Sequence, residues 1–415
     1  MHKEAIILAG GLGTRLRDAV PDLPKCMAPV NGLPFLTYVI RHLLSQGVEK
    51  FIFSLGYKHE IIEEFLNSRF STLNFQCCIE EEPLGTGGAI RLTCKQTTEK
   101  NVLVLNGDTL YKIDVQEFYQ SHLNHLSFCS MALKPMQDFN RYGVVEINKG
   151  SVVKSFKEKQ FYESGLINGG VYVLHVESFL KKGFPEKFSF EKDFLEKEFI
   201  HNNIYGFIQN KYFIDIGIPE DYQKAQKELK YNPPDLKAID RSWTLFIDRD
   251  GVINYEKKDD YIRNWQEFHF YDGVKESLAM LSKKFGKIIV VSNQRGVGRG
   301  FMTDADLADI HENMVREIET AGGHIDKIYY CSSTDNKHIS RKPNPGMALQ
   351  AKKDFPDIDP TRSIMIGNNS SDMLFARNAG LFSVFLKTTK PEHPLPHPAI
   401  DLSFRSLTDF ANACS

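Results

Sequence analysis

The sequence predicts an α/β protein with two domains, each built on a mostly parallel β-sheet covered by helices. Three observations carry this prediction. Short apolar runs alternate with segments of helical periodicity from the start of the chain. The adjacent prolines Pro233 and Pro234 then end a charged helical stretch, which cannot continue through them. A second alternating series follows, and 415 residues suffice for two domains of ordinary size.

The first half contains short apolar runs that we predict to be strands. They are Ala5–Leu8, Lys50–Leu55, Phe75–Ile79 and Val102–Leu105. Between the first two, apolar residues recur at helical spacing from Phe35 to Leu44, and Gly47 occupies a C-cap position. Further along, Val144–Ile147 and Val152–Phe156 flank an Asn-Lys-Gly turn and therefore predict a β-hairpin.

The two prolines place a linker at residues 231–241, between domains at residues 1–230 and 242–415. Apolar runs after the linker predict a second set of strands. They are Thr244–Ile247, Ile288–Val291, Ile328–Tyr330, Ile364–Ile366 and Val384–Leu386. Thr303 and Asp306 have the spacing of a capping box, which predicts that a long helix begins there.

The composition is that of an ordinary globular protein, with 42% hydrophobic and 25% charged residues. A formal net charge of −2 gives no basis for binding nucleic acid or an anionic membrane surface. No apolar run reaches about 18 residues, and the N-terminus lacks the pattern of a signal peptide. The 7 cysteines are odd in number and irregularly spaced, so we expect a reducing cytoplasm and no disulfide framework. The oligomeric state stays open.

A glycine-rich turn follows the first predicted strand, within the segment Leu8–Leu16. Glycines let backbone N–H groups approach a ligand closely, and such a turn ahead of a helix suits a phosphate. Arg15 and Lys25 add cationic groups for a triphosphate. The spacing differs from that of the G-x-x-x-x-G-K-[ST] P-loop, which disfavours an ATPase. For the glycines alone, a tight strand–helix connection is the alternative interpretation.

Two carboxylates in the first domain are candidate Mg²⁺ ligands. Asp108 follows an apolar run, at the carboxyl end of a predicted strand, where parallel sheets bind ligands. Asp215 lies in a later short apolar segment. Carboxylates suit a Mg²⁺ ion that bridges nucleotide phosphates. For Asp108 alone, a turn-forming role is the alternative.

Taken in order, these motifs resemble the sugar-phosphate nucleotidylyltransferase family over residues 1–230. The resemblance implies a Rossmann-like domain with a mixed, mostly parallel sheet, in which a sugar 1-phosphate attacks the α-phosphorus of a nucleoside triphosphate. It implies a nucleotide site at Leu8, Gly10, Gly11, Gly13, Thr14, Glu82, Pro83, Gly85, Thr86, Gly87 and Asp108. It implies a sugar-phosphate clamp at Glu158, Lys159, Asn168 and Gly170. Arg15 and Lys25 would steady the triphosphate, and Asp108 and Asp215 would hold Mg²⁺.

The second domain carries polar motifs at the ends of its predicted strands. In chain order they comprise Asp248 and Asp250, Ser292 and Asn293, Arg341 and Lys342, and the segment Gly367–Asp372. Taken alone, the first pair is also consistent with a solvated acidic turn.

In that order the motifs resemble the haloacid-dehalogenase-like phosphatases, which implies a second Rossmann-like domain. By this resemblance Asp248 is the nucleophile that forms an aspartyl-phosphate, and Asp250 protonates the leaving oxygen and later activates water. Phosphate would be bound by Ser292, Asn293, Arg341 and Lys342. Mg²⁺ would lie among Asp248, Asp250, Asn368 and Asp372. Longer matches around Asp248 and Lys342 resemble the heptose bisphosphate and histidinol phosphate phosphatase branch.

Two departures from that branch concern metals. The branch commonly carries a zinc loop, but here only Cys331 matches a thiolate position, with His338 as a substitute. Because tetrahedral zinc takes four good ligands, we expect no structural zinc. Asn368 stands where a Mg²⁺-binding Asp is usual, which removes one negative charge, while Asp372 remains.

The two resemblances together predict a bifunctional enzyme of nucleotide-activated heptose synthesis that uses Mg²⁺ in both domains. One half would remove the 7-phosphate of D-glycero-D-manno-heptose 1,7-bisphosphate. The other would transfer GMP from GTP to the heptose 1-phosphate, giving GDP-heptose and pyrophosphate. The alternatives are mannose 1-phosphate or another hexose 1-phosphate with GTP or UTP, a degenerate phosphatase half that acts as a binding or assembly module, and a histidinol phosphate phosphatase.

Overall fold

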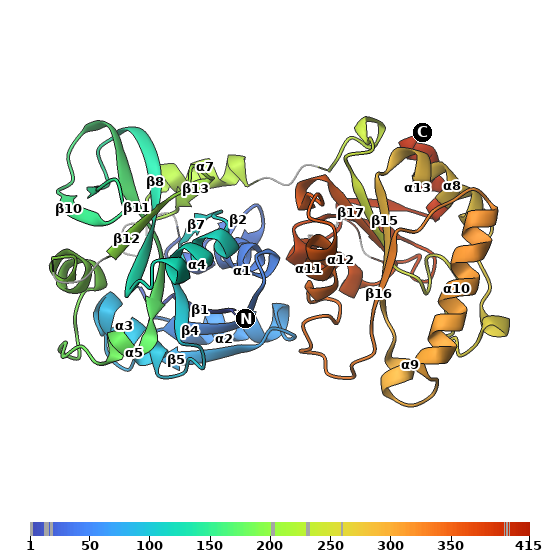
Figure 1. Cartoon of the computed structure of the whole chain (residues 1–415), viewed down its shortest axis with the longest axis horizontal. Helices are drawn as coiled ribbons and strands as arrows, with labels where there is room; N and C mark the ends of the chain where they lie inside the picture. The colour runs from blue at the N-terminus through green and yellow to red at the C-terminus, as the bar shows by residue number, and fades with distance from the viewer. Residues whose placement is uncertain are drawn as a thin grey trace. The chain divides into compact units, whose positions relative to one another are not determined.

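The computed structural model describes residues 3–11, 16, 20–200, 204–229, 233–258, 260–393, 395, 397 and 399–415. The chain divides into two compact units, Met1–Lys230 and Tyr231–Ser415, which we call unit 1 and unit 2. Each contains a β-sheet with helices packed on it (Figure 1), so the predicted α/β fold class is confirmed. Among the described residues, no helix combines the length and the apolar character that crossing a membrane requires.

Unit 1 is built on a mixed sheet of nine strands, counted over its described residues. The strands are β1 (Lys3–Leu8), β4 (Val48–Leu55), β5 (Phe75–Ile79), β6 (Asn101–Asn106), β8 (Cys129–Phe139), β9 (Val144–Ile147), β10 (Val153–Lys157), β11 (Tyr162–His175) and β12 (Ile204–Ile208). β1 is central and runs parallel to both β4 and β6. The predicted hairpin is confirmed as the antiparallel pair of β9 and β10.

The apolar run of β1 is explained by burial on both faces of this sheet. Ala5 and Ile7 pack into one apolar cluster and Ile6 packs into another. A strand covered on both faces needs a continuous apolar run rather than an alternating one. Helices supply the cover: α1 (Phe35–Ser45), α2 (His59–Arg69), α3 (Gly85–Cys94), α4 (Val115–Asn124), α5 (Val176–Leu180), α6 (Glu196–Glu198) and α7 (Pro219–Glu228).

A separate two-stranded ladder positions one part of the site in unit 1. β7 (Thr109–Tyr111) pairs antiparallel with β13 (Phe213–Asp215), so that Asp215 lies opposite Thr109. The backbone N–H of Ile216 donates a 3.1 Å hydrogen bond to the carbonyl of Asp108. The ladder therefore brings Asp215 beside Asp108, although the two residues are far apart in the sequence. Short elements nearby are η2 (Lys25–Met27), β2 (Pro29–Val30), β3 (Leu33–Pro34) and the π-helix η3 (Phe190–Leu195).

Unit 2 contains a parallel sheet in the order β16-β15-β14-β17-β18-β19. The strands are β14 (Thr244–Ile247), β15 (Lys287–Asn293), β16 (Lys327–Cys331), β17 (Ser363–Gly367), β18 (Phe382–Leu386) and β19 (Leu402–Phe404). Every strand predicted after the linker is confirmed. β14 is central, between β15 and β17. Because β14 is central and parallel, its carboxyl end is where a ligand site is expected.

Helices cover both faces of the unit 2 sheet (Figure 1). They are α8 (Val274–Lys284), α9 (Arg295–Gly298), α10 (Asp304–Thr320), α11 (Gly346–Asp354), α12 (Ser370–Ala379) and α13 (Leu407–Cys414), with short turns η4 (Leu236–Ala238), η5 (Trp265–Glu267) and η6 (Pro360–Arg362). One apolar cluster joins α8, α10 and α13 to one face, and another joins α11 and α12 to the other. The predicted capping box is confirmed: Thr303 and Asp306 form it at the start of α10.

Candidate functional sites

A cavity of about 990 Å³ opens in unit 1 at the carboxyl ends of its central parallel strands. Its lining includes these residues singled out in the sequence: Leu8, Gly10, Gly11, Lys25, Pro83, Gly85, Thr86, Asp108 and Asp215. Glu82 is exposed and Gly87 is buried, and neither lines the cavity. Gly13, Thr14 and Arg15 lie outside the described residues.

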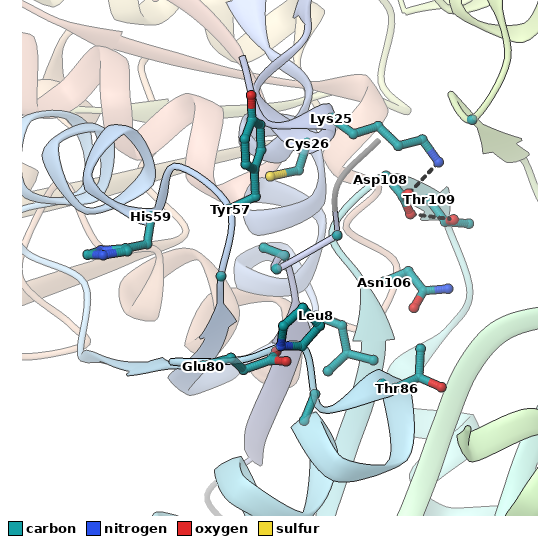
Figure 2. A pocket seen from close by; sticks show the side chains of 18 of the residues that line it. Leu8, Lys25, Cys26, Tyr57, His59, Glu80, Thr86, Asn106, Asp108 and Thr109 are labelled. Carbon is teal, nitrogen blue, oxygen red and sulfur yellow. Dashed lines mark hydrogen bonds and ion pairs between the residues drawn. The ribbon is translucent and has the colours of Figure 1, made fainter. Parts of the chain in front are cut away.

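An ion cluster of Lys25, Asp108 and Asp215 lies at one side of this cavity, and Figure 2 shows the Lys25 side chain reaching Asp108. The Lys25 ammonium pairs with the Asp108 carboxylate and lies 3.3 Å from Oδ1 of Asp215. Burial opposes the charge on Lys25, but the two carboxylates outweigh it and raise the pKa of Lys25. Burial and the charge of Asp108 raise the pKa of Asp215. Within the described part of the chain, two carboxylates thus converge on a single ammonium.

The loop that opens α3 needs its glycines because another backbone segment approaches it closely. Gly85 has a φ of +70°, and a Cβ there would lie 2.7 Å from the carbonyl oxygen of Phe188. A Cβ on Gly87 would lie 2.2 Å from the Phe188 ring, and the Gly87 N–H donates to the Phe188 carbonyl at 3.0 Å. Thr86 fixes the same contact, since its hydroxyl donates to Glu191 at 2.9 Å and accepts from the Phe190 N–H at 2.8 Å. The loop is therefore held rigidly at the cavity wall.

The sequence pattern missed several cavity residues. Glu80 accepts hydrogen bonds from Ser54 Oγ at 2.9 Å and from the Leu84 N–H at 3.1 Å, which ties the end of β4 to the α3 loop. Tyr57 and His59 also line the cavity (Figure 2). The signal was present for these two, because they follow the predicted strand that becomes β4, as Asp108 follows β6. Nothing in the sequence marked Glu191, which lies in the π-helix η3 and lines the cavity.

The predicted sugar-phosphate residues do not line the cavity in this structure. Asn168 donates from Nδ2 to the Tyr172 hydroxyl at 2.7 Å and accepts from the Gly170 N–H at 2.9 Å. Gly170 has a φ of +68°, and a Cβ there would meet Nδ2 of Asn106 at 3.0 Å. Glu158 and Lys159 are exposed in the segment between β10 and β11. Their role stays a prediction.

The polar motifs of unit 2 converge at the carboxyl end of β14. The Lys342 ammonium lies 2.9 Å from Asp248 and 2.7 Å from Asp372, and it donates to the Val291 carbonyl at 2.9 Å. Asn293 holds the Lys342 backbone from both sides, at 3.0 and 3.1 Å. Burial and the charge of Asp372 raise the pKa of Asp248 to about 7, against the opposing charge of Lys342. Despite its own burial, Lys342 has a raised pKa because of these carboxylates.

Asp250 is held by a different set of side chains. Arg249 donates to both carboxylate oxygens from Nη2, each at 2.9 Å, and Gln294 donates from Nε2 at 2.8 Å. Gln294 also donates to the Ser292 hydroxyl at 2.8 Å. Burial opposes the charge on Asp250, but Arg249 and these hydrogen bonds outweigh it and lower its pKa. These contacts therefore favour the carboxylate form of Asp250, the form that can accept a proton from water. Arg249 is 0% exposed, and no role was predicted for it from the sequence.

Asn368 is buried at the edge of this site. Its Nδ2 donates to Thr389 Oγ1 at 2.8 Å and to Glu256 at 3.3 Å, and its Oδ1 accepts from Asn369 at 3.1 Å. A Cβ on Gly251 would lie 2.0 Å from the Asn368 amide, so the glycine makes room for it. The amide thus satisfies a neighbouring carboxylate, Glu256, that an Asp at position 368 would repel.

The residues present fit Mg²⁺ at both sites in the way that phosphate-transfer sites use it. Mg²⁺ is usually held by one or two carboxylates together with substrate phosphates. Asp108 and Asp215 offer that arrangement in unit 1. In unit 2 it is offered by Asp248 and Asp372. Among the described residues no group of three or more His, Cys, Asp or Glu forms a ready-made metal cage. The two residues considered for a zinc loop lie close together, with Cys331 Sγ 3.7 Å from Nδ1 of His338.

Comparisons with known proteins divide at the same place as the two units. Residues 4–232 match the family described as nucleotidyl transferase, and residues 244–404 match the one described as polynucleotide kinase 3 phosphatase. A D-glycero-alpha-D-manno-heptose 1-phosphate guanylyltransferase from Aneurinibacillus thermoaerophilus is 51% identical over 228 residues, which cover 55% of this chain and 99% of that protein.

A second relative matches the other unit. A D-glycero-alpha-D-manno-heptose-1,7-bisphosphate 7-phosphatase from Mycobacterium bovis is 35% identical over 172 residues, 41% of this chain and 90% of that protein. Among solved structures, HddC from Yersinia pseudotuberculosis is similar with a TM-score of 0.51 and 40% identity, covering 55% of this chain and 100% of that one.

Proposed function

We propose that this chain makes GDP-heptose from a heptose bisphosphate in two steps. The premise is that the chain belongs to the nucleotidyl transferase family, through residues 4–232. Unit 2 removes the 7-phosphate of D-glycero-D-manno-heptose 1,7-bisphosphate. Unit 1 then transfers GMP from GTP to the heptose 1-phosphate and releases pyrophosphate. One observation carries the proposal: each unit is similar to nearly the full length of a relative, 99% and 90%, and the reactions named for those relatives are consecutive.

In unit 1, the phosphate oxygen of the sugar attacks the α-phosphorus of GTP, and no side chain needs to act as a nucleophile. The difficulty is that two anions must meet, so positioning and charge compensation carry the catalysis. The Lys25 ammonium, now paired with Asp108, offers its charge to the phosphates at the cavity wall. The rigid Thr86 loop supplies the surface against which the nucleotide is placed. A solved HddC structure was obtained in complex with GMP-PN, which supports a guanine nucleotide in this family.

In unit 2, a carboxylate oxygen of Asp248 attacks the phosphorus of the 7-phosphate and forms an aspartyl-phosphate. The sugar oxygen leaves with a proton from the acid form of Asp250, and the resulting carboxylate then takes a proton from the water that hydrolyses the intermediate. Lys342 compensates Asp248 and holds it at 2.9 Å. Arg249 stabilises the base form of Asp250, which the second step uses.

Mg²⁺ would be held by Asp108 and Asp215 in unit 1, and by Asp248, Asp372 and the backbone carbonyl of Asp250 in unit 2. When bound, it neutralises phosphate charge in both reactions. The buried amide of Asn368 offers a neutral oxygen at the second of these sites.

The proposal is tested by offering the purified chain a panel of sugar 1-phosphates and nucleoside triphosphates and measuring pyrophosphate release. Heptose 1-phosphate with GTP is expected to give the highest kcat/KM. The panel includes mannose 1-phosphate, because a mannose-1-phosphate guanylyltransferase from Mycobacterium tuberculosis is 30% identical over 230 residues. A preference for mannose 1-phosphate, or for UTP, would replace the proposed substrate pair.

A further inference from the structure

A carboxylate that no sequence motif marked, Glu256, lies at the edge of the unit 2 site. Its Oε2 accepts from Asn368 Nδ2 at 3.3 Å, and a Cβ on Gly251 would lie 3.0 Å from the same oxygen. Glu256 therefore approaches the turn that directly follows Asp250. It is exposed, and it forms no ion pair with a basic group in the described part of the chain, so its negative charge is not compensated there.

Two acceptors fix the direction of the Asn368 amide, which is 0% exposed. Its Nδ2 donates to Thr389 Oγ1 at 2.8 Å as well as to Glu256, so both N–H groups of the amide are used. Because an ionised carboxylate only accepts hydrogen bonds, the amide nitrogen and not the oxygen must face Glu256. The amide oxygen accepts one hydrogen bond, from Asn369. Its second lone pair is left for a cation.

Asn368 and Glu256 together carry the charge that a single Asp at position 368 would carry. An Asp there would place a second carboxylate against Glu256, and like charges at that distance repel. With Asn at this position, the amide donates to Glu256 and the negative charge lies on Glu256 instead. A Cβ on Gly251 would lie 2.0 Å from the Asn368 amide nitrogen, so this turn leaves room where the two side chains meet.

We propose that Glu256 is a positioning residue for Mg²⁺ in unit 2, which supplies the negative charge that Asn368 lacks and keeps the Asn368 oxygen available to the ion. The inference rests on the proposed phosphatase function and deepens it, because it accounts for a Mg²⁺ site without the usual Asp. Mg²⁺ usually keeps several of its waters in proteins, so a carboxylate can act on it across a water molecule. The exposed position of Glu256 suits that role.

Stabilisation of unit 2 by Mg²⁺ tests the inference without turnover. Both tryptophans lie in unit 2, so thermal unfolding of the full chain followed by tryptophan fluorescence reports on that unit. An ion that binds only the folded state raises the unfolding temperature, and the dependence on its concentration gives the affinity. Glu256→Gln should weaken Mg²⁺ binding roughly tenfold. Glu276→Gln, an exposed acid of α8 with the same change of charge, is the matched control and should leave the affinity unchanged.

Returning the charge to position 368 separates this role from a structural one. The double variant Glu256→Gln with Asn368→Asp should recover the wild-type affinity for Mg²⁺. Asn368→Asp alone sets two carboxylates side by side, so unit 2 should unfold at a lower temperature without Mg²⁺ and gain more stability from the ion. The assignment is overturned if Glu256→Gln keeps the wild-type affinity, if the double variant stays as weak as the single one, or if wild-type unit 2 gains no stability from Mg²⁺.

Phosphate release by the wild-type chain is measured separately. If none is seen while Glu256→Gln weakens Mg²⁺ binding and the double variant restores it, the role of Glu256 stands and the phosphatase proposal fails. If release is seen while Glu256→Gln binds Mg²⁺ as the wild-type chain does, the phosphatase proposal stands and the role of Glu256 fails.

Discussion

The Lys342 ammonium lies 2.9 Å from the carboxylate of Asp248, at the carboxyl end of the central strand of unit 2. Lys342 comes from a segment far along the chain, and its backbone is clamped by Asn293. A buried lysine held in this way stabilises the charge that a nucleophilic carboxylate must carry. Unit 1 contains a similar pairing, of Lys25 with Asp108.

Asp248→Asn should abolish phosphate release and leave nucleotidyl transfer intact. The amide keeps the shape of the side chain but is a poor nucleophile, so we expect release to fall by about a thousandfold or more. Free phosphate and pyrophosphate are measured in parallel with the purified full chain. Unchanged phosphate release would support the alternative that unit 2 is a binding or assembly module.

Lys25→Gln should impair nucleotidyl transfer and leave phosphate release intact. It removes the ammonium that compensates Asp108 and Asp215, so pyrophosphate release should fall on the order of 100-fold, as for other lost electrostatic contacts in transfer sites. Phosphate release by unit 2 should persist. Lys149→Gln, an exposed lysine in the β9–β10 hairpin, is the matched control. A fall no larger than that of the control would remove Lys25 from the mechanism.

Gly87→Ala should destabilise unit 1, because its Cβ would lie 2.2 Å from the Phe188 ring. Overpacking of this kind costs about 1–3 kcal/mol. Both tryptophans, Trp243 and Trp265, lie in unit 2. The midpoint of unfolding measured by circular dichroism should therefore shift, while the midpoint measured by tryptophan fluorescence should not. Gly183→Ala is the control, since its Cβ would meet nothing within 4 Å; equal shifts for both variants would contradict the packing argument.

The stability of unit 1 should depend on the ionisation of Glu4. Burial raises the pKa of Glu4, but hydrogen bonds from Thr98 and the charge of Lys50 outweigh it, so its pKa lies below the ordinary 4.5. A carboxyl with a lowered pKa in the folded state stabilises the fold above its unfolded pKa. This contribution is lost as the pH falls through the folded value. Glu4→Gln should therefore cost more stability at pH 7 than at pH 3, by denaturant unfolding; an equal cost at both values would refute this.

The strands could be predicted from the sequence more readily than the arrangement of the sites, for a physical reason. The runs at Ala5–Leu8 and Thr244–Ile247 are strands because strands buried on both faces need continuous apolar residues, a local property. The convergence of Lys25, Asp108 and Asp215 depends on the register of β7 against β13, which is a long-range property. The family resemblance indicated these residues, but hydrophobic periodicity alone did not predict that they lie together.

The polar partners were the least predictable part. Arg249 stands between two aspartates, a pattern typical of an exposed turn, yet it is fully buried because Asp250 pairs with it. Glu191 reaches the cavity through a hydrogen bond to Thr86, from a segment with no motif. Pairings of this kind depend on which elements pack together. No pattern within either segment predicts that packing.

If one chain performs both reactions in sequence, analysis of its products will show it. The full chain is supplied with D-glycero-D-manno-heptose 1,7-bisphosphate, GTP and Mg²⁺, and the products are identified by mass spectrometry. We expect GDP-heptose without a 7-phosphate, together with equal amounts of phosphate and pyrophosphate. Heptose 1-phosphate that accumulates with no nucleotide sugar, or a GDP-heptose that keeps its 7-phosphate, would contradict it.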